Sequence, residues 1–335
     1  MAERYGKVLE QYELDVYNTY KSRGALMAVC QNGQIIRVSE YNGNCYRIQN
    51  MAYILDEIKN LGFDNVETIL KNKEDSYITI GSDRASYIAT TWFDGRECDV
   101  TNYKDILKGC MAIAKLHNAF DRMDISNCIN YARYNIYTDF SRHLRELRRI
   151  QSYLACKINK AEFEQLAYYN IQKNISSAEI VVQTLIDNER HGIINIERDK
   201  NICHGNFSYH NLINMSNGVA ITGFEKIEYY VDIWDFYNFL RKVMEKNGWD
   251  INLGTKMIQE YNTYRHITNR DYIYLKLLLA YPEKFWKIIN YYYNNKKVWI
   301  PEKNTEKLNK VVHQTLLKNE FIKTVFNNVC EKECV

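Results

Sequence analysis

The sequence predicts an α+β protein with a small β-rich lobe at its N-terminus and a large, mostly helical lobe after it. Short runs rich in β-branched and aromatic residues, separated by turn signals, fill residues 23–93. After Trp92, long stretches carry apolar residues at helical spacing. We therefore expect two lobes, residues 1–92 and residues 93–335.

The elements of the first lobe follow from local turn signals and periodicity. Residues 23–41 hold two β-rich runs around an Asn-Gly pair, which is a strong signal for a hairpin. Residues 51–63 place apolar side chains at helical spacing and stop at a glycine. Residues 66–70 and 76–93 are predicted to be strands.

The second lobe is predicted to be helical, with one exception. A second Asn-Gly pair lies within residues 212–225 and predicts a β-hairpin inside the helical region. We expect four to five helices after this hairpin. The clearest helical patterns lie at residues 103–120, 135–158, 161–190, 232–246 and 282–294, with a long one from about Pro301.

The charge balance excludes several classes of partner. The chain has 44 Lys and Arg against 41 Asp and Glu, so we expect no nucleic-acid binding. No apolar run approaches the ~20 residues of a membrane span, and we expect no membrane insertion. The first residues show no signal-peptide pattern, which predicts synthesis in the cytoplasm.

The nine cysteines lack the paired spacing of a zinc site, so they are expected to be reduced. Cys330 and Cys334 would share one face of a continuing helix. They belong either to a charged, frayed tail or to an exposed thiol pair available for cross-linking.

Residues 204–211 have the frame of a phosphotransferase catalytic loop, reading His-Gly-Asn-Phe-Ser-Tyr-His-Asn. This resembles the His-Gly-Asp-x-x-x-x-Asn loop of the aminoglycoside-phosphotransferase and choline-kinase-like superfamily, and most closely the CotS-type spore-coat family. Residues 92–100, 112–120 and 224–244 support the resemblance in the same order along the chain. The resemblance implies a two-lobed protein-kinase-like fold.

The resemblance also implies that three functional positions have changed. Asn206 stands where the family has the catalytic Asp, and a carboxamide is not a usable base. Gly223 stands where the family has a metal-binding Asp, and Ser39 where it has a phosphate-contacting Lys. Asn211 keeps the terminal Asn of the loop, but one neutral ligand makes a poor magnesium site.

Substitutes for the changed residues stay open at this point. Glu225 lies two residues after Gly223 and would return to the same strand face as a weak candidate metal ligand. Arg37 or Arg47 could replace the lysine at Ser39. The expected remnant of a nucleotide cleft comprises Arg37, Thr91, Trp92, Phe93 and Asn211.

Three further residues of the frame are expected to be structural. His204 and Gly205 would fix the loop, with a role of His204 as a base as the alternative. Asp235 matches the family's Asp at the start of the following helix, where a carboxylate accepts backbone N–H bonds or caps the helix.

Together these features predict a catalytically degenerate kinase-fold protein, a pseudokinase, that acts as a structural or interaction component of the bacterial spore coat. Other spore-coat proteins are the expected partners, and the 28 tyrosines favour an assembly role modestly. No cofactor is expected. The alternatives are an unorthodox small-molecule phosphotransferase using ATP and magnesium, and a nucleotide-sensing pseudokinase.

Overall fold

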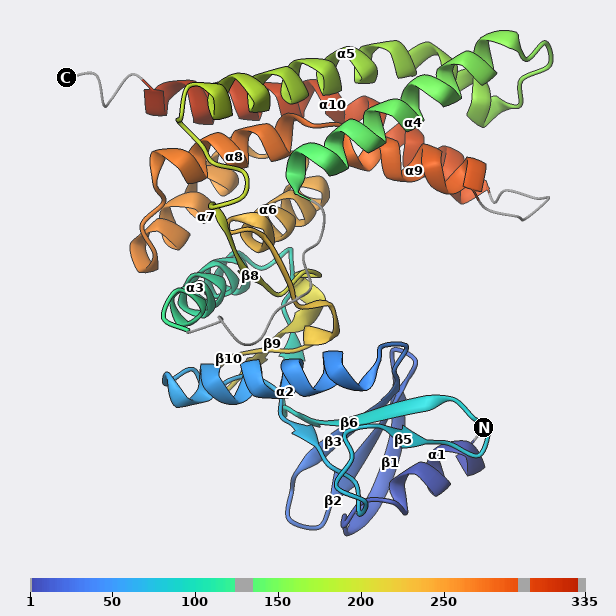
Figure 1. Ribbon diagram of the computed structural model, residues 1–335, viewed down its shortest axis with the longest axis vertical. Helices are drawn as coiled ribbons and strands as arrows, with labels where there is room; N and C mark the ends of the chain where they lie inside the picture. Colours follow the sequence, from blue (N-terminus) through green and yellow to red (C-terminus); the bar gives the residue numbers. More distant parts are fainter. Residues whose placement is uncertain (1, 124–134, 295–301, 331–335) are drawn as a thin grey trace. The chain divides into compact units, whose positions relative to one another are not determined.

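The structure is a computed structural model that describes residues 2–123, 135–294 and 302–330 (Figure 1). Cys334 and the side chain of Cys330 lie outside the described part, so the expectation of a thiol pair is not addressed. Contacts between residues divide the chain into two compact units. We call them the sheet unit, Met1–Tyr131 with His204–Glu228, and the helical unit, Ala132–Cys203 with Tyr229–Val335. This grouping joins the central hairpin to the β-rich part of the chain.

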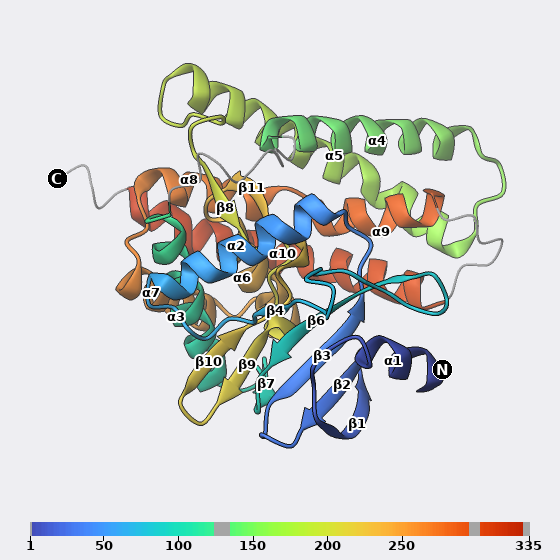
Figure 2. The same cartoon turned by 60° about the horizontal axis from the view of Figure 1, so that its bottom comes forward.

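The sheet unit is built around a six-stranded antiparallel sheet (Figure 2). Its strands follow the order β1-β2-β3-β6-β4, and β5 also pairs with β6. Their bounds are β1 Val16–Ser22, β2 Ala25–Cys30, β3 Ile35–Glu40, β4 Ile69–Leu70, β5 Thr79–Ile80 and β6 Ser86–Trp92.

The first predicted hairpin is confirmed, because β2 and β3 pair antiparallel with Leu26 opposite Val38. Gly33 occupies the turn with φ +80°, a conformation that glycine adopts at no steric cost. The sequence analysis missed strand β1 and helix α1 (Ala2–Leu9). Most of β1 is exposed, so it shows no alternation of buried and exposed residues that would predict a strand.

Helix α1 covers one face of this sheet. Tyr5 and Val8 pack against apolar side chains that point to the same face from neighbouring strands. These are Leu26, Ala28, Cys30, Ile36, Val38, Tyr87 and Ala89. Since side chains alternate along a strand, Arg37 and Ser39 point to the opposite face of β3.

Helix α2 (Cys45–Asn60) starts earlier than the expected residue 51. Asn44 caps it by accepting a hydrogen bond from the backbone N–H of Arg47 at 2.8 Å. Asn44 is a preferred N-cap residue, and this signal lies outside the apolar pattern used for the prediction.

The rest of the sheet unit carries the central hairpin. Strands β9 and β10 pair through the second predicted Asn-Gly turn, and β9 also pairs with β7. The bounds are β7 Arg96–Glu97, α3 Tyr103–Phe120, the 3-10 turn η1 Tyr209–Asn211, β9 Leu212–Met215, β10 Gly218–Ile221 and the 3-10 turn η2 Phe224–Lys226.

The helical unit contains the predicted antiparallel pair and five later helices, within the described residues. Figure 1 shows α4 and α5 side by side, with α10 along α5. The bounds are α4 Ile136–Cys156, α5 Glu162–Arg190, β8 Lys200–Cys203, β11 Glu228–Val231, α6 Trp234–Lys246, α7 Ile251–Tyr264, α8 Asn269–Ala280, α9 Glu283–Asn294 and α10 Glu302–Cys330.

Aromatic stacking joins α4 to α9 and to the residue that follows α8. The rings of Phe140 and Tyr281 stack at 3.7 Å, and the Tyr281 hydroxyl donates to the Phe140 carbonyl at 2.8 Å. The ring of His143 stacks on Trp286 at 3.3 Å. These contacts bury much of the inner face of α4. None of the described helices is long and apolar enough to cross a membrane.

Replacement of Leu147, a fully buried residue of α4, should show how much this packing stabilises the fold. Leu147→Ala should lower the free energy of unfolding by about 2 to 5 kcal/mol, because it removes buried methyl groups and leaves a cavity. Leu316→Ala is the matched control, since Leu316 is 70% exposed and the change should stay within about 0.5 kcal/mol. Urea denaturation measures both, and equal effects would contradict the packing described.

Candidate functional site

The loop that resembles a catalytic loop begins at a fully buried histidine. His204 Nε2 donates to the Thr222 carbonyl at 3.0 Å, and its Nδ1 faces the backbone N–H of Asn206 at 3.4 Å. The ring packs against Phe207 and Phe224. Since both ring nitrogens have partners inside the protein, His204 connects the loop to the end of β10 and has no nitrogen available to act as a base.

Gly205 is required where the loop passes close to η2. Its φ is +78°, and a Cβ there would lie 2.0 Å from the carbonyl oxygen of Lys226. No other residue type fits this approach without moving the backbone.

Asn206 and Asn211 are the two carboxamides of the loop. Asn206 is exposed and Asn211 half-buried. The side-chain oxygen of Asn211 accepts a hydrogen bond from Ser208 Oγ at 2.8 Å. One of the two lone pairs of this oxygen is therefore taken by a protein donor.

Gly223 ends the strand that leaves the hairpin. It has φ +85°, and a Cβ there would lie 2.3 Å from Asn211 Nδ2. The expectation that Glu225 continues this strand on the face of Gly223 is wrong. The left-handed residue turns the chain out of β10, and Glu225 lies in the turn η2 instead.

A buried carboxylate holds this bend. Glu67 is fully buried, and its Oε1 accepts backbone hydrogen bonds from Gly223 at 2.8 Å and from Phe224 at 3.0 Å. Its Oε2 has no hydrogen-bond partner among the described residues. Burial, followed by the charge of Glu225, raises the pKa of Glu67 to about 7.

Glu225 forms an ion pair with Arg37. Arg37 Nη1 lies 3.0 Å from Glu225 Oε1, and the two side chains are 21% and 29% exposed. The guanidinium also lies 5.6 Å from the centre of the Trp92 ring. The structure thus brings together the candidate phosphate-binding cation and the candidate metal-binding carboxylate, and they bind each other. Arg47 lies in the first turn of α2.

The other residues of the expected cleft lie on β3, on β6 or just after β6. Ser39 is buried, and its hydroxyl has no partner among the described residues. Thr91 Oγ1 accepts from the backbone N–H of Thr68 at 2.8 Å. Trp92 ends β6, and Phe93 follows it half-buried.

Asp235 belongs to the helical unit, where it is fully buried in the first turn of α6. Ile233 is the N-cap residue of this helix, and no side chain caps it. Asp235 therefore does not act as the N-cap.

The described residues contain no cluster of three or more His, Cys, Asp or Glu side chains that could hold a metal ion. The residues at the remnant site do not fit a magnesium–nucleotide complex either. Asn211 and Glu225 are both engaged by protein partners, and Gly223 offers no side chain.

The fold is found in solved phosphotransferases. It resembles an aminoglycoside phosphotransferase from Alicyclobacillus acidocaldarius subsp. acidocaldarius DSM 446, with a TM-score of 0.82, 16% identity, and coverage of 97% of this chain and 96% of that chain. It also resembles spectinomycin phosphotransferase APH(9)-Ia in complex with ADP and spectinomycin, with a TM-score of 0.64 and 11% identity. That match covers 94% of this chain and 97% of the other. It further resembles a choline/ethanolamine kinase family protein from Mesorhizobium loti, with a TM-score of 0.59 and 11% identity. That match covers 97% of this chain and 98% of the other.

These similarities show that the chain has a two-lobed kinase-like fold, and the predicted fold class is confirmed. The chain belongs to the family described as spore coat putative kinase YutH, whose model matches residues 6–325. The family resemblance stated from the sequence is thereby confirmed. No curated protein matches the sequence.

Sequence reasoning missed Glu67, which accepts the backbone hydrogen bonds of Gly223 and Phe224 at the bend. A signal was present, because Glu67 is an acidic residue inside the apolar run Val66–Leu70. An acid in a predicted buried strand needs a hydrogen-bond partner, and this requirement marks such a residue for attention.

Gly205→Ala should lower the free energy of unfolding by about 2 to 5 kcal/mol, since it adds backbone strain and a clash with the Lys226 carbonyl. Gly33→Ala is the matched control. Gly33 has a similar φ of +80° but nothing within 4 Å of the added Cβ, so about 1 to 2 kcal/mol is expected. Urea denaturation of both variants separates strain from contact. A Gly205 variant no less stable than the Gly33 variant would contradict the close approach.

Glu67→Gln should change how stability depends on pH. Because the folded-state pKa of Glu67 is raised to about 7, its contribution to stability is lost as pH rises from about 4.5 through 7. Glutamine keeps an acceptor for Gly223 and Phe224 but does not titrate. The stability of the variant relative to wild type should therefore rise by on the order of 3 kcal/mol between pH 4 and pH 8.

The control for this measurement is Glu74→Gln, at an exposed loop position. Its difference from wild type in urea denaturation should stay constant over the same pH range. If the Glu67 variant also shows a constant difference, its carboxylate is not desolvated as described.

Proposed function

We propose that this chain is a kinase-fold protein that has lost phosphoryl transfer and serves as a structural or interaction component of the bacterial spore coat. The observation that carries the first part is the ion pair of Arg37 with Glu225 at 3.0 Å. The side chains of Arg37 and Glu225 would have to break this ion pair and bind a nucleotide or a metal ion before phosphoryl transfer could occur.

Phosphoryl transfer depends on positioning and on neutralising charge, with a base or orienting group at the nucleophile. Asn206 supplies no base. Gly223 supplies no carboxylate, and an aspartate there would be strained by the left-handed backbone and would have to displace the side-chain amide of Asn211. Removal of a general base by itself costs about 10²- to 10⁴-fold in rate.

The charges around Arg37 also oppose the binding of a triphosphate. Glu225 neutralises the guanidinium, and the buried Glu67 adds negative charge once the pH exceeds its pKa of about 7. A nucleotide would meet a site with no net positive charge, so it gains little from its phosphates.

The coat role is supported by the family and by what the chain retains. The chain belongs to a family whose description is spore coat putative kinase YutH. His204 and Gly205 keep geometric roles in the loop that do not need a catalytic acid. The chain keeps the loop that resembles a catalytic loop, although its catalytic positions have changed. This combination favours a fold that serves to bind other proteins, and the proposed partners are other spore-coat proteins.

Thermal unfolding with 5 mM ATP, with and without magnesium, tests the loss of nucleotide binding. No rise in Tm is expected under either condition, because the site has no net positive charge to attract the phosphates. The test is sensitive, since a ligand at 100 times its Kd would add about 2.7 kcal/mol to the stability of the fold. The spectinomycin phosphotransferase whose solved complex contains ADP is the positive control.

The other outcomes separate the alternatives. A rise only with magnesium, accompanied by ATP consumption, would overturn the proposal in favour of a phosphotransferase that uses Glu225 and Asn211. An equal rise without metal would favour a nucleotide sensor. Coat assembly is tested in spores that lack the wild-type chain. Asn206→Ala should restore the coat as well as wild type does, and failure would mean that this position serves chemistry.

A further inference from the structure

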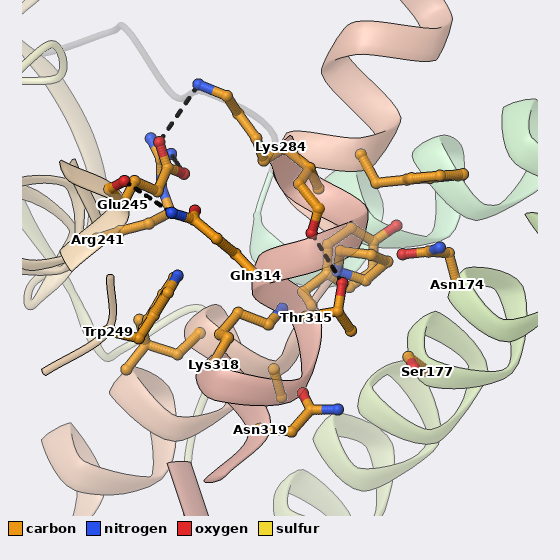
Figure 3. Close-up of a pocket in the computed structure, with 16 residues that line it drawn as sticks. Asn174, Ser177, Arg241, Glu245, Trp249, Lys284, Gln314, Thr315, Lys318 and Asn319 are labelled. Atoms are coloured by element: carbon orange, nitrogen blue, oxygen red, sulfur yellow. Dashed lines mark hydrogen bonds and ion pairs between the residues drawn. The ribbon is translucent and has the colours of Figure 1, made fainter. Parts of the chain in front are cut away.

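A small cavity lies inside the helical unit, away from the residues of the remnant site in sequence. It is formed by α5, α6, α10 and the segment that joins α8 to α9 (Figure 3). Its volume is about 50 Å³. Every residue that lines it belongs to the helical unit, so the cavity is defined by this unit alone.

The cavity wall carries more positive than negative charge. Arg241, Lys284 and Lys318 face Glu245, the single acidic residue of the lining. Glu245 binds Arg241 and also lies 3.3 Å from Lys284 Nζ (Figure 3). Two cations thus share one carboxylate.

Lys318 is the cation left over. It lies half-buried on α10, and no hydrogen bond or ion pair joins it to any described residue. Its pKa is lowered to about 8, mainly by burial and also by the charge of Arg241, against the opposing effect of Glu245. A lysine that loses water without gaining an anion destabilises the fold in its charged form.

Arg241 is built rigidly into the wall. The residue is 8% exposed. Its guanidinium forms an ion pair with Glu245 and lies 5.7 Å from the centre of the Tyr237 ring. Its Nε has no hydrogen-bond partner among the described residues. The positive charge on this side of the cavity is therefore fixed in place and only partly compensated.

The wall also contains apolar side chains, with Trp249, Pro282 and Phe285 among its residues. Gln314 is held in place by donating to the Glu245 carbonyl at 3.1 Å. An anion in this cavity would meet lysine donors together with hydrocarbon, which is the usual composition of a small-ligand site.

The size of the cavity limits the ligand. A water molecule takes about 30 Å³ in the liquid, and an engineered cavity of about 150 Å³ holds benzene. A volume of about 50 Å³ accepts a group with two oxygens but not an aromatic ring. We propose that this cavity binds the carboxylate group of a small organic acid, between Lys318, Lys284 and Arg241. This site is independent of the proposed function at the remnant kinase site.

Acetate is the probe that tests the site, because it is little more than the carboxylate itself. Sodium acetate should raise the Tm of the full chain by about 2 °C in a saturable way, relative to sodium chloride at the same ionic strength. Sodium phosphate at matched ionic strength is the third arm.

Lys318→Met is the decisive variant. Methionine keeps the apolar stem and removes the charge, so the variant should have a higher Tm than wild type without acetate and should lose the acetate response. Lys310→Met is the matched control, because Lys310 lies exposed on the same helix. It should respond to acetate as wild type does.

Each other outcome overturns the proposal. An equal rise with chloride means a general effect of salt. A rise with phosphate alone assigns the site to another class of anion. A Lys318→Met variant that keeps the acetate response, or that has a lower Tm than wild type without acetate, shows that Lys318 has a structural role and binds no anion.

Discussion

The buried carboxylate of Glu67 holds the backbone bend on which the candidate site depends. It accepts hydrogen bonds from two consecutive N–H groups, at Gly223 and Phe224, in a region that water does not reach. Such bonds are strong because the surroundings are dry, and they strengthen further when the pH exceeds the raised pKa of Glu67 and the acceptor becomes charged. They fix the point where the chain leaves β10, and the position of Glu225 opposite Arg37 follows from that bend.

The same bend shows how a kinase-like frame can be kept when the loop carries Asn206 in place of an acid. His204 donates to the carbonyl of Thr222, the residue before the bend, and Gly205 passes close to the carbonyl of Lys226 just after it. These contacts need a histidine and a glycine, but they do not need an acid at Asn206. The constraints on folding and the constraints on catalysis therefore fall on different residues of one short loop.

The two units differ in how far their partly buried cations are paired with carboxylates. In the sheet unit, Arg37 and Glu225 neutralise each other and leave little attraction for an anion. In the helical unit, Arg241 and Lys284 share Glu245, and Lys318 has no partner among the described residues. Charge complementarity thus points away from the remnant site as the place where an anion binds and towards the small cavity in the helices.

The sequence by itself determined the elements whose signals are local. Asn-Gly pairs predicted both hairpins, apolar spacing predicted most helices, and the loop at residues 204–211 identified the family. The tertiary structure alone decided that Glu67 holds the bend, that Arg37 binds Glu225, and that Lys318 lines a cavity. Turns and periodicity are recorded in neighbouring residues, whereas these contacts join residues as far as 188 positions apart. Only the folded chain brings such residues together.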